Sequence, residues 1–433
     1  MSAVPSVMPS LMYRAVVAAS VPLVPLFLRD PRQRAAHRAR LAAPEQLASW
    51  ARAHRDPTRP LAWFHAPSVG EGLQARAVMA ALRSDLPDMQ FIYTHFSPSA
   101  EDFAARLAAD WCGYLCYDRI GDVERMLTAA APDLLVFTKL DLWPELAIRA
   151  AHRGARVAMV AATVSAVSSR LRWPARRAAT PGYAALDLAL AVAPEDVSRL
   201  AVLGCRADRI VLTGDPRVDS VLEVAEAGGE RVLGGTAADR ILVAGSTWPE
   251  DEAMVLAAFR EVRRTHPDAR LILAPHQPTA AHLHGIDAAA RTSGLPDPVR
   301  LGGLVDGPLP PIVAVDRTGV LARLYRVGTF AYVGGGFGHA GIHSVFEPAA
   351  WSRPVVIGPR DRDSRDARLL DEAGALTRLT GAAPAAQLAG IWRRYLDMPD
   401  RAQAAGAAGR AALDRERGAA RRSAEMLRNL LTR

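Results

Sequence analysis

Short apolar runs alternate with helix-like stretches along most of the chain. In its first half, five runs are predicted to be strands: Leu61–His65, Gln90–Thr94, Leu134–Phe137, Val157–Val160 and Leu186–Val192. A turn and then a helical pattern follow each run. This alternation predicts an α/β fold, in which a mostly parallel sheet carries helices on both faces.

The pattern restarts after a connecting stretch that we place near residues 215–236. The strands predicted in this second series are Arg240–Ala244, Arg270–Ala274, Ile312–Val315, Thr329–Val333 and Val355–Ile357. The last stretch, residues 384–433, has a helical composition with a break near Pro399 and weak points at Gly406 and Gly409. We therefore expect an N-terminal segment (1–40), a first Rossmann-like domain (41–215), and a second with a terminal helix (216–433).

The N-terminal segment combines an apolar run with a basic flank. The run, Ala15–Leu28, is too short to span a bilayer, which needs about 20 residues. We predict an uncleaved anchor that lies in or dips into the membrane, with arginines on anionic cytoplasmic headgroups. The alternative is a buried helix followed by a solvated basic stretch. The arginines of the flank are Arg29, Arg32, Arg34, Arg38 and Arg40.

Composition narrows the class of partner. A net charge of +8 and a pI near 9.9 favour anionic partners. The basic residues are scattered and do not alternate with aromatic ones, so no nucleic-acid binding is predicted. The three cysteines, Cys112, Cys116 and Cys205, are too few for a disulfide framework and fit packing roles in a reducing compartment.

The loop after the first predicted strand contains a possible general base. Gly70 permits a tight turn, and Glu71 precedes a helix predicted from Leu73 to Arg83. A carboxylate at a helix N-terminus is stabilised in its ionised form, which can take a proton from an acceptor hydroxyl. The alternative is a capping box, in which Ser68 and Glu71 satisfy helix-end amides.

Two further strand ends carry polar residues. His95 and Ser97 could contact a ligand, although helix capping by Ser97 or Ser99 explains the hydroxyls equally well. Lys139 and Asp141 alternate onto one side at the end of another strand, where charges are costly unless they are used or paired. Catalysis and a mutual ion pair between Lys139 and Asp141 are both open.

In the second domain, the first strand ends in small residues whose amides suit a phosphate, Gly245, Ser246 and Thr247. Thr247 and Glu250 could instead form a capping box. His276, at the next strand end, could contact a phosphate or a base, or be an ordinary loop residue.

The most informative stretch is glycine-dense and runs from residue 334 to residue 341. Gly335 and Gly336 leave room for a diphosphate or monophosphate at a helix that begins near Ser344. Glu347 lies one turn further on and can reach a ribose hydroxyl. The stretch is not a P-loop. Because no acidic pair or histidine cluster is evident, we predict no metal.

In order and spacing, these motifs resemble those of the 3-deoxy-D-manno-octulosonic acid (Kdo) transferases, glycosyltransferases of the GT-B class. The resemblance covers nearly the whole chain. It rests on the N-terminus, the segments 65–71, 93–99, 132–136, 142–144, 213–214, 244–247 and 334–335, and His343 with the segment 347–350.

The resemblance implies two Rossmann-like domains that face each other across a cleft. It also implies transfer of Kdo from CMP-Kdo to a lipid A precursor in lipopolysaccharide synthesis, with inversion, without an essential metal and without a cofactor. The glutamate that matches Glu71 would be the base. Lys139 and Asp141 remain further catalytic candidates from the residue pattern. The acceptor side would use Ser68, Gly70, His95 and Ser97. CMP would contact Gly245, Ser246, Thr247, His276, Gly335, Gly336, His343, Ser344 and Glu347.

The sequence departs from the family pattern at four places. Lys139-Leu140-Asp141 stands where the family usually has Glu-Thr-Glu, Thr163 where it has arginine, His276-Gln277 where it has Arg-His, and Ser344-Val345 where it has Asn-Pro. These changes leave two alternatives open. One is transfer of another nucleotide sugar to a membrane lipid, and the other is a catalytically inactive nucleotide-binding protein.

Overall fold

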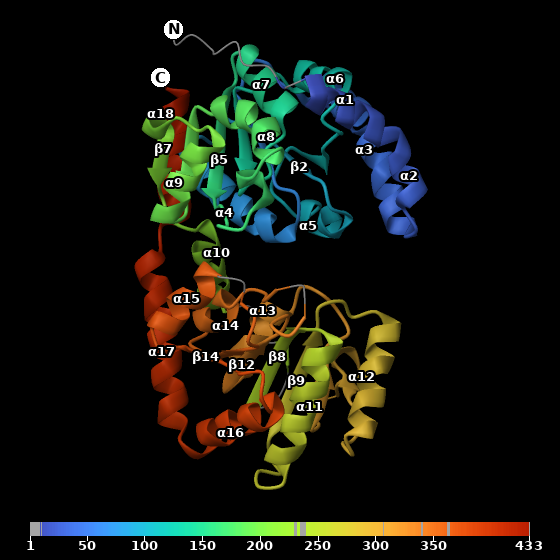
Figure 1. Ribbon diagram of the computed structural model, residues 1–433, viewed down its shortest axis with the longest axis vertical. Helices are drawn as coiled ribbons and strands as arrows, with labels where there is room; N and C mark the ends of the chain where they lie inside the picture. Colours follow the sequence, from blue (N-terminus) through green and yellow to red (C-terminus); the bar gives the residue numbers. More distant parts are fainter. Residues whose placement is uncertain are drawn as a thin grey trace. The chain divides into compact units, whose positions relative to one another are not determined.

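The chain forms two compact units, each an α/β structure with a parallel sheet (Figure 1). The first unit comprises Met1–Ser220 with Gly418–Arg433, and the second comprises Val221–Arg417. The computed structural model describes residues 9, 11–228, 232–233, 240–305, 307–338, 341–361 and 364–432. The predicted α/β class with two Rossmann-like domains is confirmed.

The first unit is built on seven parallel strands in the order β3-β2-β1-β4-β5-β6-β7. Successive side chains of β1 enter opposite cores: Trp63 faces one layer of helices, whereas Ala62 and Phe64 face the other. Both faces are therefore covered, as all-parallel sheets require. The strands are β1 Leu61–His65, β2 Gln90–His95, β3 Trp111–Tyr114, β4 Leu134–Thr138, β5 Arg156–Ala162, β6 Leu188–Ala191 and β7 Ile210–Leu212.

Helices α3, α6, α7, α8 and α9 contribute to the core on one face of this sheet, and α4 and α18 contribute to the core on the other. The last helix, α18, thus returns to the first unit, although we had predicted that residues 216–433 form one domain. The helices are α3 Pro31–His54, α4 Val69–Asp85, α5 Glu101–Ala104, α6 Ile120–Ala130, α7 Pro144–His152, α8 Ala175–Ala184, α9 Pro194–Leu203, α10 Pro216–Ala227 and α18 Ala419–Leu431.

Hydrogen bonds and apolar contacts hold α18 in place. The Asp219 carboxylate accepts from the backbone amides of Gly418 (2.6 Å) and Ala420 (2.7 Å), so it caps the start of the helix. Ala424 and Leu427 are fully buried against α4 and the sheet. The chain therefore crosses between the units twice, once within α10 and once at residue 417.

The N-terminal segment forms α1 (Leu11–Ser20) and α2 (Val24–Phe27), joined by a short 3₁₀ turn. Its large apolar side chains are exposed, including Leu26 at 77% and Phe27 at 79%, so the alternative of a buried helix is wrong. Nowhere in the described residues is a helix both long and apolar enough to cross a membrane. Residues 1–8 and 10 of the predicted anchor lie outside the described part of the chain.

Polar side chains attach α1 to the first unit. The Tyr13 hydroxyl donates to Asp118 over 2.6 Å, and the Arg14 guanidinium pairs with the fully buried Glu145. Burial raises the pKa of the Asp118 carboxyl to about 6. The apolar side chains of α1 are left facing outward.

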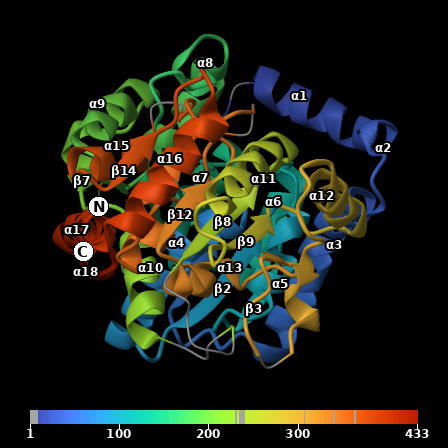
Figure 2. The same ribbon diagram turned by 90° about the horizontal axis from the view of Figure 1, so that it is seen from below.

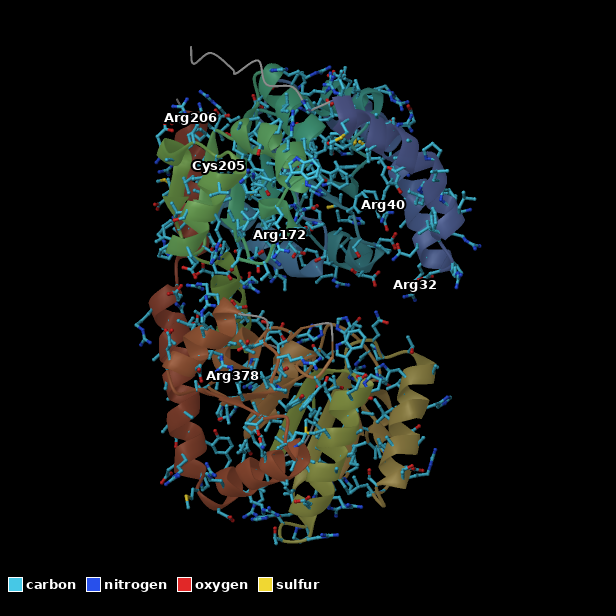
Figure 3. All side chains as sticks on the ribbon, viewed as in Figure 1. Arg32, Arg40, Arg172, Cys205, Arg206 and Arg378 are labelled. Atoms are coloured by element: carbon cyan, nitrogen blue, oxygen red, sulfur yellow. The ribbon has the colours of Figure 1, made fainter. Side chains whose placement is uncertain are left out.

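One arginine of the predicted basic flank has a different role. Arg40 is buried, and its guanidinium donates to the Phe96 carbonyl (2.6 Å) and lies 4.0 Å from the centre of the Phe96 ring. It cannot reach lipid headgroups, so the prediction is wrong for this residue. Arg29, Arg32, Arg34 and Arg38 are exposed; Figure 3 labels Arg32 and Arg40.

The second unit also has seven parallel strands, in the order β10-β11-β9-β8-β12-β13-β14. Helices α11 and α16 lie side by side against its sheet (Figure 2), where Phe259 stacks on Trp392. The strands are β8 Ile241–Thr247, β9 Arg270–Pro275, β10 Val299–Arg300, β11 Ile312–Ala314, β12 Phe330–Val333, β13 Val355–Ile357 and β14 Leu376–Arg378. The helices are α11 Pro249–Arg263, α12 Ala280–Thr292, α13 Leu321–Leu324, α14 Phe346–Ala350, α15 Arg365–Glu372, α16 Pro384–Asp397 and α17 Pro399–Glu416.

The sequence pattern identified all the central strands but missed strands at the sheet edges. Strands β3, β10 and β14 were not predicted, and β7 was seen only as the end of a series. These strands have two to four residues and are only partly buried, so they lack a continuous apolar run.

Two helical glycines provide a matched test of close packing. A Cβ atom on Gly406 of α17 would lie 1.9 Å from the Ser352 carbonyl oxygen, whereas one on Gly390 of α16 would meet no atom within 4 Å. We expect Gly406→Ala to destabilise the protein by about 1–3 kcal/mol because the helix must move away. Gly390→Ala should raise stability by up to about 1 kcal/mol. Thermal unfolding of both variants tests this, and equal effects would contradict the packing role.

Candidate functional site

The first polar cluster lies where the strand order of the first sheet reverses. Strands β1 and β4 are neighbours, yet the chain runs from β1 toward β3 on one side and from β4 toward β7 on the other. Ligands of open α/β sheets bind at the carboxyl ends of the strands at such a switch point. His65 ends β1, and Lys139 and Asp141 follow β4, so two polar residues singled out in the sequence meet here with a histidine that was not.

Glu71 is held by two side chains at this edge. One carboxylate oxygen accepts from the Ser68 hydroxyl, and the other accepts from the Lys139 ammonium over 2.9 Å. The helix begins at Val69 rather than Leu73, so Gly70 and Glu71 lie in its first turn. Ser68 is the N-cap residue, but its hydroxyl bonds no helix amide, and the capping-box interpretation is therefore wrong.

The environment of Glu71 favours its ionised form. Burial disfavours the charge, but the Lys139 ammonium and the Ser68 hydroxyl outweigh it, so the pKa of Glu71 lies below its usual range. The side chain remains 16% exposed. Glu71 is thus an ionised carboxylate that a ligand can still reach.

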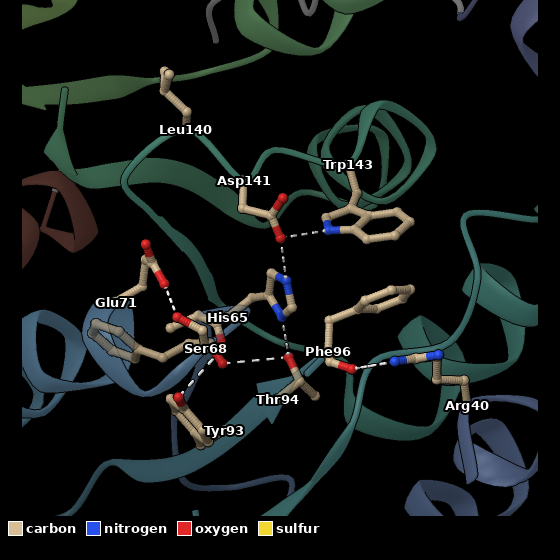
Figure 4. A network of polar contacts seen from close by, with 12 residues as sticks. Arg40, His65, Ser68, Glu71, Tyr93, Thr94, Phe96, Leu140, Asp141 and Trp143 are labelled. Carbon is tan, nitrogen blue, oxygen red and sulfur yellow. Dashed lines mark hydrogen bonds and ion pairs between the residues drawn. The ribbon is translucent and has the colours of Figure 1, made fainter. Parts of the chain in front are cut away.

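Lys139 and Asp141 have other partners, so the alternative of a mutual ion pair is wrong. Asp141 instead accepts from the His65 ring and from the Trp143 indole, both over 3.1 Å (Figure 4), and Arg170 lies 3.7 Å away. Burial opposes the charge, but these contacts keep the pKa of Asp141 below its usual range.

A buried relay fixes the orientation of His65. The ionised Asp141 carboxylate can only accept, so Nε2–H of His65 donates to it over 3.1 Å. The Thr94 hydroxyl accepts from the Trp63 indole (2.9 Å) and lies 3.0 Å from Nδ1 of His65. His65 and Thr94 are fully buried, so the relay ties β1, β2 and the loop after β4 together.

The other residues predicted on the acceptor side are structural in their contacts. His95 is buried against Tyr114, with ring centroids 4.2 Å apart, and burial lowers its pKa. Ser97 accepts from the Ser99 amide over 3.3 Å, so the capping interpretation holds for this residue.

The second polar cluster lies at the switch point of the other sheet, between β8 and β12. Its central residue, Asp251, was missed in the sequence. Its carboxylate accepts from the amides of Trp248 (3.0 Å) and Gly335 (2.9 Å) and from the Tyr332 hydroxyl (2.6 Å). Asp251 therefore fastens the glycine-dense loop to the turn after β8.

The alternative of a capping box formed by Thr247 and Glu250 is wrong. Thr247 is fully buried, and its hydroxyl donates to Glu252 over 3.0 Å, while Trp248 and Asp251 form the helix start. Gly245 and Ser246 remain at the strand end, where Ser246 has a positive φ of 52°. A Cβ on Gly245 would lie 2.1 Å from the Tyr325 hydroxyl, so only glycine fits there.

Three rings stack beside this turn. His276 lies between Trp248 and His343, with ring centroids 5.0 Å and 4.4 Å away. The Trp248 indole donates to Nε2 of His343 over 3.2 Å. Burial lowers the pKa of both histidines, that of His343 to about 4, so the stack is neutral near pH 7. The sequence indicated both histidines but not Trp248.

Glu347 lies in the first turn of α14, which has only five residues. Burial raises the pKa of its carboxyl to about 7, so near neutral pH it can donate or accept a hydrogen bond. Ser344 precedes this helix and is half-buried. Gly335 has a φ of 95°, and a Cβ on Gly336 would lie 2.7 Å from Gly358, so both positions need glycine.

The two clusters differ in chemistry. The first offers an ionised carboxylate next to an ammonium, and the second offers glycine-rich backbone, neutral rings and a titrating carboxyl. Among the described residues, no group of three or more His, Cys, Asp or Glu side chains is placed to hold a metal ion.

Sequence comparisons find related proteins over most of the chain. The family model for 3-deoxy-D-manno-octulosonic-acid transferases (kdotransferases) matches residues 36–220. The 3-deoxy-D-manno-octulosonic acid transferase of Bordetella pertussis is 30% identical over 97% of this chain and 99% of its own length. The transferase of the same name from Haemophilus influenzae is 23% identical over 97% of this chain and 98% of its own.

Solved structures resemble the fold at low sequence identity. The UDP-GlcNAc 2-epimerase of Neisseria meningitidis aligns with a TM-score of 0.59 and 11% identity, covering 87% of this chain and all of its own. A glycosyltransferase from Rickettsia africae aligns with a TM-score of 0.56 and 9% identity, covering 86% of this chain and 99% of its own.

Two glycines of the same loop test how tightly the second cluster is built. A Cβ on Gly334 would lie 2.5 Å from the Ser246 carbonyl oxygen and 2.9 Å from Asp251, whereas one on Gly338 meets nothing within 4 Å. We expect Gly334→Ala to destabilise the second unit by about 1–3 kcal/mol. Amide hydrogen exchange at Gly335 should then be faster. Gly338→Ala should leave that exchange unchanged, and similar exchange in both variants would contradict the role of Asp251.

Proposed function

The chain belongs to the 3-deoxy-D-manno-octulosonic acid (Kdo) transferase family, and from this premise we propose that it transfers Kdo from CMP-Kdo to a hydroxyl of a lipid A precursor. Membership confirms the resemblance found in the motifs. The protein is a glycosyltransferase of the GT-B fold that moves Kdo in lipopolysaccharide biosynthesis. The donor nucleotide and the acceptor lipid are parts of the proposal.

The observation that carries the proposal is the state of Glu71. Its carboxylate is ionised, lies at the switch point of the first sheet, and remains within reach of a ligand. In the proposed step, the acceptor hydroxyl gives its proton to Glu71 while its oxygen bonds to the anomeric carbon of Kdo. The bond from that carbon to the phosphate oxygen breaks, and CMP leaves with the electron pair. Attack opposite the leaving group inverts the anomeric carbon.

The second unit supplies suitable contacts for CMP. The strand-end residues Gly245 and Ser246 and the loop glycines Gly335 and Gly336 bring backbone close to where a phosphate would bind. The proposal gives Glu347 the ribose hydroxyls and gives His276 and His343 the phosphate or the base. No cofactor or metal has a part in these steps.

The N-terminal segment supports a site of action at the cytoplasmic face of the inner membrane. Exposed apolar side chains of α1 and α2 are followed by exposed arginines, the combination that binds anionic lipid surfaces. In this proposal, the segment brings the first unit to its lipid acceptor.

Replacement of Glu71 tests the reaction. We expect Glu71→Gln to lower Kdo transfer by about 10²- to 10⁴-fold, because the amide cannot take the proton. Transfer from in situ-generated CMP-Kdo to a tetraacyl lipid A precursor can be followed by mass spectrometry. Glu372→Gln, at an exposed position on α15, should keep wild-type activity and serves as the control.

Normal turnover by the folded Glu71→Gln variant would remove Glu71 as the base. A panel of CMP-, UDP- and GDP-linked sugars tests the donor. Preference for a UDP- or GDP-sugar would replace CMP-Kdo, and nucleotide binding without transfer to any lipid would indicate an inactive homologue.

Membrane binding is tested at the end of α2. We expect Leu26→Asp combined with Phe27→Asp to weaken binding to anionic vesicles at least about tenfold, because each side chain buried in lipid contributes about 1.5–3 kcal/mol. Co-sedimentation with phosphatidylglycerol vesicles measures this. Val202→Asp replaces an apolar side chain that is 52% exposed on α9 and should have no effect. Equal binding by both variants would contradict the proposal.

A further inference from the structure

Lys139 is the only lysine in the chain, which has 53 lysine and arginine residues in total. Every other basic side chain of that set is an arginine. The single lysine follows β4 at the switch point and bonds the proposed base, Glu71, over 2.9 Å. Its backbone has a φ of 63°, a left-handed conformation that is unfavourable for a residue with a side chain. A strained position and a unique residue type thus coincide beside the base.

Lysine and arginine would act differently at this position. The planar guanidinium of arginine binds a carboxylate through two parallel hydrogen bonds, whereas an ammonium on a flexible stem is a point charge with three donors. Lys139 is 46% exposed, so a second anion can reach its ammonium while Glu71 occupies one donor. Asp141, two residues away, takes its hydrogen bonds from His65 and Trp143 instead.

The ion pair also weakens Glu71 as a base. Lys139 is the largest influence that lowers the pKa of the carboxyl, in opposition to burial. A carboxylate with a low pKa takes a proton from a hydroxyl less readily. In the absence of an acceptor, the ion pair therefore keeps Glu71 ionised but makes it a weaker base. Loss of the ion pair would raise the pKa of Glu71, so the carboxylate would be a stronger base and less fully ionised.

We propose that Lys139 selects the acceptor: an anionic group beside the accepting hydroxyl draws the ammonium away from Glu71, and the released carboxylate then takes the hydroxyl proton. This inference rests on the proposed function. The acceptor class is a sugar that carries a phosphate or a carboxylate next to its reactive hydroxyl. A neutral acceptor leaves the pair closed and reacts slowly.

Because the lysine is unique, its movement can be observed directly. Growth on lysine labelled with carbon-13 at Cε places one lysine signal in the whole protein, and Lys139→Arg identifies it by removing it. We expect added methyl phosphate to shift this signal saturably in the wild type, toward its position in Glu71→Gln, where the pair is absent. A signal unmoved by methyl phosphate overturns the inference, whether or not the protein transfers Kdo.

Transfer assays then test selectivity with three matched tetraacyl acceptors. Next to the accepting hydroxyl they carry a phosphate, a carboxymethyl group or a neutral hydroxyl. We expect the wild type to prefer one or both anionic acceptors roughly 10- to 100-fold in kcat/KM, a factor typical of a charge-assisted contact. The anionic acceptor that is preferred more strongly identifies phosphate or carboxylate as the recognised group. Lys139→Met should reduce either preference to about threefold or less.

Lys139→Arg distinguishes the release of Glu71 from the mere presence of a positive charge at position 139. It keeps the cation but should clamp Glu71, so we expect kcat on the anionic acceptor to fall about tenfold. Wild-type rates in Lys139→Arg, or an equal loss on all acceptors in Lys139→Met, would overturn the inference. If the lysine signal responds to phosphate but no acceptor is glycosylated, the proposed function fails while anion sensing by Lys139 stands.

The pH dependence provides a further check. The decrease of kcat/KM at low pH reports the pKa of Glu71 in the free enzyme, where Lys139 lowers it. The decrease of kcat at low pH reports the pKa of Glu71 in the enzyme–substrate complex. In the wild type, we expect kcat to decrease at a higher pH than kcat/KM does. In Lys139→Met, we expect both to decrease at the same pH. Besides Lys139 and the Ser68 hydroxyl, Tyr93 of β2 faces Glu71, and burial raises its pKa, so it stays neutral in this range. If kcat and kcat/KM of the wild type decreased at the same pH, the release of Glu71 from Lys139 would be contradicted.

Discussion

The need to satisfy a fully buried imidazole organises the first site. Parallel strands bring all their carboxyl ends to one edge, and at the switch point this places His65 beside the loop that follows β4. Both ring nitrogens then require partners, because an unpaired buried polar group is costly. Thr94 supplies one partner and Asp141 the other, so a hydrogen bond of this histidine helps to fix the loop that contains residues 139–143. The position of Lys139 depends on that loop.

The second site depends on one carboxylate in a comparable way. Asp251 gathers two backbone amides and a tyrosine hydroxyl from three segments, and it thereby sets the distance between the glycine-dense loop and the turn after β8. The glycines are needed because these segments approach more closely than a Cβ permits. In both units, buried polar contacts shape the loops, while the sheets determine only where the loops begin.

Sequence patterns revealed the central strands and the strand-end residues because both depend on local features. Apolar runs such as Leu134–Phe137 mark buried strands, and Lys139 and His276 stand within two residues of such runs. The pairing between segments was not visible. The sequence suggested that Ser68 caps a helix and that Lys139 pairs with Asp141, because near neighbours in the chain are the partners a pattern can propose. Their actual partners are chosen in three dimensions, as are those of Asp251 and of Arg40.

The return of α18 to the first unit has a consequence for how the protein is made. Residues 1–220 are made before the second unit, yet the helix that completes the cover of one sheet face is made after it. While about 200 further residues are added, the apolar surface that Ala424 and Leu427 will cover stays open. The second unit, by contrast, is continuous in sequence. The first unit therefore cannot complete its fold until residues that follow the second unit have been made, and its unfinished sheet face is open to chaperones during that time.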